Sequence, residues 1–146
     1  MVNYKVLIVA SFYYEEISKN LIEGAKLIFK EHNIDYKILT TNGSFEIPFL
    51  INRNIKNYDA FVALGCIIKG ETYHFELISN EVTRKIMDLS ISSNKPIGFG
   101  IITCENIKQA IARSNVESSS TTVKVGKGGE AALVVTNLLY DKAIHP

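Results

Sequence analysis

Hydrophobic positions along this chain form two kinds of pattern, short continuous runs and longer stretches with a helical period. Short runs rich in β-branched residues predict four strands, at residues 5–12, 35–41, 60–68 and 96–103. Apolar residues that recur every three or four positions predict helices over residues 15–32, from about residue 45, from residue 74, over 105–114 and over 130–144. Residues 115–129, which are rich in serine, threonine and glycine, are predicted to form a loop.

The alternation of strands and helices indicates an α/β fold, a three-layer α-β-α sandwich around a four-stranded, mainly parallel sheet. A length of 146 residues, with 47% hydrophobic residues, is typical of one domain, predicted to extend over residues 1–146. Ligands of such sheets bind beyond the carboxyl ends of the strands. We therefore expect a functional site in the segments that follow strands, at residues 12–14, 43–46, 66–74 and 103–105.

Composition argues against several kinds of partner. A formal net charge of +1 provides no general attraction for nucleic acid or anionic lipid. Cys66 and Cys104 are too few for a disulfide scaffold, which favours a reducing compartment. The first residues do not have the pattern of a signal peptide, and no apolar stretch approaches the roughly 20 residues of a membrane-spanning helix. We expect a cytoplasmic protein that binds neither nucleic acid nor membranes.

Several residues in these segments could carry chemistry, and each also has a structural interpretation. Phe12 and Phe45 offer faces for a planar ring, although phenylalanine is more often part of a core. Glu46 could bind a ligand or complement a helix dipole. His74 could transfer protons or cap the helix that it opens, and Arg113 would ordinarily complement the negative end of its helix. The three histidines show no metal-ligand spacing, so no metal is expected.

Four ordered blocks of residues resemble the lumazine synthase family. The most specific block covers residues 63–76 and continues at 80–82, and the others cover residues 43–48, then 96–100 with 105–113, then 127–132. The resemblance spans nearly the whole chain and implies a flavodoxin-like fold. It also implies a transferase of riboflavin biosynthesis, which condenses 5-amino-6-(D-ribitylamino)uracil with 3,4-dihydroxy-2-butanone 4-phosphate to 6,7-dimethyl-8-ribityllumazine and releases phosphate. No cofactor is implied.

The resemblance also implies roles for individual residues. His74 would be the catalytic proton-transfer residue. The pyrimidine and its ribityl chain would be bound by Phe12, Ser44, Phe45, Glu46, Cys66, Ile67, Ile68, Phe99 and Lys127. The butanone phosphate would be bound by Glu71, Thr72 and Arg113. Because Phe99, Arg113 and Lys127 would reach into the neighbouring subunit, the active site is expected to be shared between adjacent subunits of a homo-oligomer, and a lone subunit is expected to be inactive.

Two positions depart from the family pattern. Lys69 stands where the family often has arginine, a change that we interpret as tolerated. The segment at residues 114–126 is longer than the link that many members have there. Because insertions at this point accompany free pentamers in the family, the resemblance favours a homopentamer over a sixty-subunit shell. It also implies riboflavin synthase as a protein partner.

Three other functions compete with synthesis of a lumazine. A non-catalytic paralogue that binds a lumazine or a flavin would not need His74, Arg113 and Lys127 together. A structural protein devoted to assembly is disfavoured by the long segment at residues 114–126. A nucleotide-binding domain would need a glycine-rich loop after the first strand, where residues 11–14 contain no glycine.

Overall fold

Four parallel strands form one sheet in the order β2-β1-β3-β4. They are β1 (Lys5–Ser11), β2 (Asp35–Thr41), β3 (Ala60–Ile68) and β4 (Ile97–Cys104). The computed structural model describes residues 3–119 and 121–140. Its register pairs Ser11 with Thr41 and Ile68 with Cys104, so the last residues of neighbouring strands lie beside each other. The carboxyl ends of the strands therefore meet at one end of the sheet.

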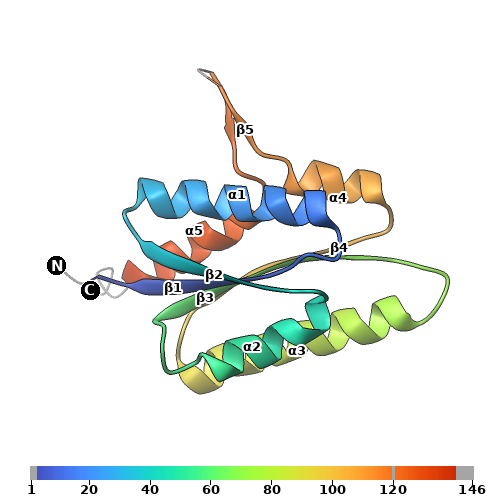
Figure 1. The fold of residues 1–146 in the computed structure, drawn as a ribbon, viewed down its shortest axis with the longest axis horizontal. Coiled ribbons are helices and arrows are strands. Elements are labelled where there is room, and N and C mark those ends of the chain that lie inside the picture. The colour runs from blue at the N-terminus through green and yellow to red at the C-terminus, as the bar shows by residue number, and fades with distance from the viewer. Residues whose placement is uncertain (1–2, 120, 141–146) are drawn as a thin grey trace, which may run out of the picture.

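Helices cover both faces of this sheet (Figure 1). One face carries α1 (Glu15–Glu31), α4 (Ile107–Ser114) and α5 (Gly126–Tyr140), and the other carries α2 (Ile47–Arg53) and α3 (His74–Ser93). Because successive strand residues point to opposite faces, β1 contributes to two cores. Val6 and Ile8 pack beneath α1 and α5, and Leu7 and Val9 pack beneath α2 and α3. The predicted three-layer α-β-α sandwich is confirmed.

The strongly patterned elements lie where the sequence predicts them. The strands predicted at residues 35–41 and 60–68 have the observed bounds, β1 ends one residue earlier than predicted, and β4 is shifted by one residue at both ends. A short 3-10 turn, η1 (Ser44–Glu46), precedes α2. α4 begins two residues later than predicted because Asn106 caps it, with its side-chain oxygen accepting a hydrogen bond from the backbone N–H of Gln109 at 2.9 Å.

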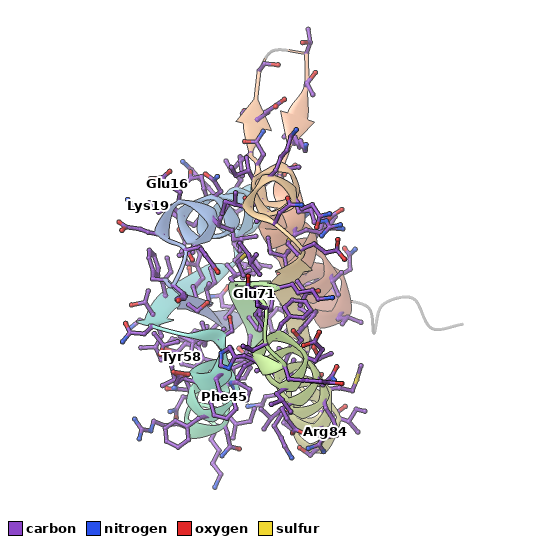
Figure 2. All side chains as sticks on the ribbon, turned by 90° about the vertical axis from the view of Figure 1, so that its right-hand side faces the viewer. Glu16, Lys19, Phe45, Tyr58, Glu71 and Arg84 are labelled. Atoms are coloured by element: carbon purple, nitrogen blue, oxygen red, sulfur yellow. The ribbon has the colours of Figure 1, made fainter. Side chains whose placement is uncertain are left out.

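The predicted loop at residues 115–129 is wrong in two respects. It contains an antiparallel hairpin of β5 (Glu117–Ser118) and β6 (Val123–Lys124), which projects beyond the layer of α1 and α4 (Figures 1 and 2). The last helix also begins inside that range, at Gly126 instead of residue 130. The predicted end of this helix at residue 144 lies outside the described residues.

Glycines explain the early start of α5. A Cβ on Gly128 would lie 2.0 Å from the carbonyl oxygen of Leu21, and a Cβ on Gly24 would lie 2.1 Å from the carbonyl oxygen of Val125. The backbones of α1 and α5 therefore touch, and only glycine leaves enough room at these two points. In the part of the chain that the structure describes, no helix has the length and apolar character needed to cross a membrane.

Candidate active site

A cavity of about 480 Å³ opens at the carboxyl ends of the strands. Sites for small molecules usually have volumes of roughly 300–1,000 Å³ and combine apolar walls with a few polar groups. The walls here are formed by Tyr13, Tyr14, Gly43, Ser44, Phe45, Glu46, Cys66, Ile67, Ile68, Gly70, Thr72, His74, Phe75 and Ile78. The cavity therefore has the size, position and composition of a site for a small, partly polar ligand.

The fold brings together most of the residues predicted for the subunit's own part of the site. Those that line the cavity are Ser44, Phe45, Glu46, Cys66, Ile67, Ile68, Thr72 and His74. They come from three segments that are separate in sequence: the turn before α2, the end of β3, and the loop that leads into α3. Figure 2 looks onto this end of the sheet and shows Phe45 and Glu71 from two of these segments.

The turn before α2 presents its side chains differently from residue to residue. Ser44 is buried, whereas Phe45 is 60% exposed and Glu46 is also exposed. Ile47 is fully buried and packs in the core beneath α2 and α3. Pro48 suits the first turn of α2, where a proline displaces no hydrogen bond of the helix. A ring face and a carboxylate thus stand at the cavity while the residues on either side of them are held in the protein.

Tyr13 and Tyr14 are cavity residues to which the sequence analysis gave no role. Their rings meet edge to face, with centroids 4.9 Å apart, and Tyr13 is 69% exposed. Phe75 and Ile78 also line the cavity without having been predicted to. The sequence contained signals for all four residues. The two tyrosines follow the first predicted strand, at its carboxyl end, and Phe75 and Ile78 are three positions apart and so share one side of α3.

Two side chains of the cavity wall, Cys66 and Tyr14, have raised pKa values. Burial, and to a smaller extent the neighbouring Cys104 thiol, raises the pKa of the Cys66 thiol to about 12. Burial is also the main cause of a raised pKa for Tyr14, with the Cys66 thiol and Tyr13 as smaller causes. At neutral pH both groups therefore stay protonated, and Tyr14 offers the cavity a neutral hydrogen-bond donor.

His74 is the first residue of α3 and is exposed to solvent. Its backbone N–H donates a hydrogen bond of 3.3 Å to the hydroxyl of Thr72, which lies two residues earlier. This bond fixes the direction in which the chain enters the helix. Because imidazole is the side chain that most often moves protons near neutral pH, this position suits a proton-transfer group at the border of the cavity.

Two predicted site residues lie close to the cavity but do not line it. Phe12 is partly buried and packs against the core beneath α1, and its backbone N–H donates to the carbonyl of Thr41 at 2.9 Å. Glu71 is exposed in the loop after β3, next to the lining residues Gly70 and Thr72.

Three predicted residues lie away from the cavity of their own subunit. Phe99 is 44% exposed on β4, which is the last strand of the sheet. Arg113 of α4 donates from Nη1 to the carbonyl of Thr103 at 3.2 Å and to Sγ of Cys104 at 3.5 Å. Lys127 is exposed and forms an ion pair of 3.0 Å with Glu130. None of the three lines the cavity in a single subunit.

The described residues hold no group of three or more His, Cys, Asp or Glu side chains placed to bind a metal ion. The cavity itself offers aromatic faces, one carboxylate, hydroxyls, protonated acids and one imidazole. These groups can bind a planar polar molecule and move protons.

A parallel α/β sheet with such a cavity at its carboxyl end is typical of the class of α/β proteins that bind small molecules. Residues 3–141 match the family model described as 6,7-dimethyl-8-ribityllumazine synthase. The chain belongs to this family.

Relatives that carry the family name support this membership across the chain. The 6,7-dimethyl-8-ribityllumazine synthase of Agrobacterium fabrum is 41% identical over 140 residues, covering 91% of this chain and 93% of its own. That of Bartonella henselae is 43% identical over 137 residues, covering 91% of this chain and 86% of its own. That of Methylorubrum populi is 39% identical over 145 residues, covering 94% of this chain and 82% of its own.

Proposed function

We propose that the cavity at the carboxyl ends of the strands is where this chain performs the reaction of its family. The chain is a transferase of riboflavin biosynthesis that forms 6,7-dimethyl-8-ribityllumazine from 5-amino-6-(D-ribitylamino)uracil and 3,4-dihydroxy-2-butanone 4-phosphate. The observation that carries the assignment of the site is the convergence of the three segments ending in Glu46, Ile68 and His74 on one cavity.

The reaction suits these groups. The primary amine of the pyrimidine attacks the ketone, loss of water gives an imine, and phosphate leaves by elimination. Elimination leaves an enol, which tautomerises to a new ketone at the former C3 hydroxyl, and the ribityl-bearing nitrogen closes the ring on this ketone with loss of a second water. Each step moves a proton, and His74 at the border of the cavity is the residue to which we assign these transfers. Holding two substrates in register supplies much of the acceleration, since well-oriented groups reach effective molarities of roughly 10⁵ M or more.

The pyrimidine and its ribityl chain would occupy the part of the cavity between the turn before α2 and the end of β3. Phe45 and Glu46 reach it from the turn, and Cys66, Ile67 and Ile68 border it from the strand. Because Cys66 stays protonated, it presents no charge to the pyrimidine. Stacking of Phe12 on the ring stays a prediction. The next two residues, Tyr13 and Tyr14, line the cavity.

The butanone phosphate would lie near Glu71 and Thr72 of one subunit and near Arg113 of the neighbouring subunit. In a single subunit Arg113 and Lys127 are outside the cavity, as expected for residues that complete a neighbour's site. The family implies small-molecule substrates and assembly of several copies of the chain. We propose that Phe99, Arg113 and Lys127 of one subunit close the cavity of the next, so that each active site is shared.

We further propose a homopentamer in preference to a sixty-subunit shell. The segment between α4 and α5 supports this choice, because its β5–β6 hairpin projects from the subunit instead of forming a short link (Figure 1). Light scattering on the purified protein tests it, and a mass near that of sixty subunits would contradict it.

We also propose that residues 1–146 act as one domain in the cytoplasm, with riboflavin synthase as a partner that consumes the product.

The first experiment is a direct assay with both substrates. Lumazine absorbance and phosphate release are followed together, with the uncatalysed condensation as background. Formation of lumazine well above that background, with one phosphate released for each lumazine, supports the proposal. No acceleration combined with tight binding of lumazine or flavin would instead identify a non-catalytic paralogue.

A further inference from the structure

The turn that presents Phe45 and Glu46 to the cavity is held to the protein at two points. Ile47 is fully buried in the core beneath α2 and α3. Ser44 is 6% exposed, and its Oγ lies 3.1 Å from the Oγ of Ser11, the last residue of β1. Since Phe45 and Glu46 are themselves exposed, their positions depend on the backbone between these two points.

Both points of attachment meet above Gly65 of β3. A Cβ on Gly65 would lie 2.6 Å from the Oγ atoms of both Ser11 and Ser44, and 3.6 Å from Cδ1 of Ile47. No side chain fits at 2.6 Å without displacing the two hydroxyls. The absence of a side chain at residue 65 therefore allows the hydroxyls to pair over the strand.

Ser11 is held from the opposite face of the sheet. The hydroxyl of Ser18 in α1 donates to the backbone carbonyl of Ser11, and both serines are 1% exposed. Ser11 also stands opposite Thr41 in the sheet register. Its hydroxyl is thus attached to a rigid part of the molecule that does not line the cavity, whereas its partner Ser44 does. Ser44 is the cavity-lining residue that the Ser11 hydroxyl contacts.

We propose that Ser11 is a positioning residue for the pyrimidine-binding part of the site. Through its hydrogen bond to Ser44 it fixes the 3-10 turn that presents Phe45 and Glu46. The side chain of Glu46, which precedes α2, makes no capping bond, and the hydroxyl pair links the turn to the sheet. The identity of the ligand rests on the proposed function.

A double-mutant cycle tests this role. Ser11→Ala, Ser44→Ala and the double variant are compared with the wild type by KM for each substrate, kcat, and the dissociation constant of the lumazine product. Loss of one buried hydrogen bond predicts that Ser11→Ala raises the pyrimidine KM and the product dissociation constant about three- to tenfold. KM for the butanone phosphate stays within about twofold, because that substrate does not contact the turn.

The decisive result is the effect of Ser11→Ala in the Ser44→Ala background. If Ser11 acts through Ser44, adding Ser11→Ala to the Ser44→Ala variant changes neither its pyrimidine KM nor its product dissociation constant. Thr136→Val is the matched control, because it removes a buried hydroxyl that bonds the Ala132 carbonyl at 2.9 Å within α5, and it leaves both values unchanged. If Ser11→Ala does not fold, Ser11→Cys replaces the hydroxyl by a weak hydrogen-bond donor of similar shape and is expected to raise the same two constants.

Two outcomes would overturn the inference. One is a pyrimidine KM that Ser11→Ala leaves unchanged, and the other is an equal increase with and without the Ser44 hydroxyl, which would show an independent structural effect. The wild-type assay separates these outcomes from failure of the proposed function. A wild type that forms lumazine with an additive cycle overturns the role of Ser11 alone, whereas a wild type that neither forms nor binds lumazine overturns both.

Discussion

The cavity side of the subunit and the side carrying Phe99, Arg113 and Lys127 are built in different ways. The cavity is concave, and its polar groups stand on short segments attached to a buried sheet. The other three residues are exposed on β4, α4 and α5. Two of these side chains bond within their own subunit, Arg113 to the end of β4 and Lys127 to Glu130.

The difference shows which part of a site one chain can specify alone. Binding of a planar ring needs walls, and the subunit supplies them from its own strands and turns. Neutralising a phosphate needs a cation, and Arg113, the residue predicted for this role, bonds the Thr103 carbonyl and does not line the cavity of its own subunit. Under the proposed shared site, assembly of the homo-oligomer would bring one copy's exposed cation to another copy's cavity.

The largest effect that we expect comes from the cavity side. His74→Ala should lower kcat by about 10²- to 10⁴-fold and leave measurable turnover, because proton transfer is one contribution beside the positioning of two substrates. Steady-state kinetics measure the decrease in kcat and the residual turnover. His32→Ala is the control, since that imidazole bonds the Ile28 carbonyl at the end of α1, and it should not change kcat. Complete loss of activity in a folded His74→Ala protein would contradict the expected residual turnover.

Arg113→Ala tests the other side. It should lower kcat/KM for the butanone phosphate by about 10- to 100-fold, the usual value of a hydrogen bond to a charged group, and leave the pyrimidine KM unchanged. Arg113→Lys keeps the charge and should recover part of the loss, because lysine cannot bind a phosphate through two parallel bonds. An equal loss for both substrates would argue that Arg113 stabilises the fold and does not bind phosphate.

Mixing the two impaired variants tests whether His74 of one subunit and Arg113 of another act in the same site. In oligomers assembled from equal amounts of His74→Ala and Arg113→Ala subunits, about a quarter of the shared sites would combine an intact His74 with an intact Arg113. Activity should rise toward that fraction of the wild-type value after co-assembly. Activity that stays at the level of the separate variants would place both residues in one subunit's site.

Gly65→Ala is expected to have a smaller effect, confined to the cavity side. The new Cβ would stand 2.6 Å from the hydroxyls of Ser11 and Ser44 and force them apart. We expect a pyrimidine KM raised about tenfold and a loss of about 1–3 kcal/mol in the free energy of unfolding, as for other overpacked sites. Kinetics and urea unfolding measure the two values. An unchanged pyrimidine KM despite lower stability would separate the packing of Gly65 from binding.

The sequence predicted the sheet and most of the cavity because their signals are local. A buried strand such as β3 is a continuous apolar run between polar breaks, and its bounds follow from that pattern. The residues that follow a parallel strand then lie at the ligand-binding end whatever their neighbours are. Ser44, Cys66 and His74 were found by this argument together with the family resemblance.

The parts that were missed depend on contacts between distant segments. The start of α5 contains glycines at 126, 128 and 129, which are typical of loops. Gly128 and Gly129 lie against Leu21 and Gly24 of α1, and Gly126 lies against the carbonyls of residues 114 and 115, so none of these contacts is local in sequence. The two-residue strands β5 and β6 carry too short a pattern to be recognised. The pairing of Ser11 with Ser44 over Gly65 joins residues 33 positions apart and leaves no periodic signal.

The smallest effect concerns the two thiols that lie between the compared regions, since Cys66 lines the cavity and Cys104 contacts Arg113. The pKa of Cys66 is raised from 9.0 to about 12, first by burial and then by Cys104. The folded protein thus keeps a proton that the unfolded chain releases. Its contribution to stability is complete below about pH 9 and is lost as the pH rises toward 12.

Cys66→Ala removes this titration. From about pH 9 upward, the free energy of unfolding of the wild type should fall more steeply than that of the variant, by at most about 1.4 kcal/mol for each pH unit. Urea unfolding at pH 7.5, 9 and 10 would measure the difference, with other titrating groups common to both proteins. A difference that stays constant over this range would mean that the cavity wall at Cys66 is open to water. In that case the wall would resemble the exposed side of the subunit, and burial would no longer distinguish the two regions.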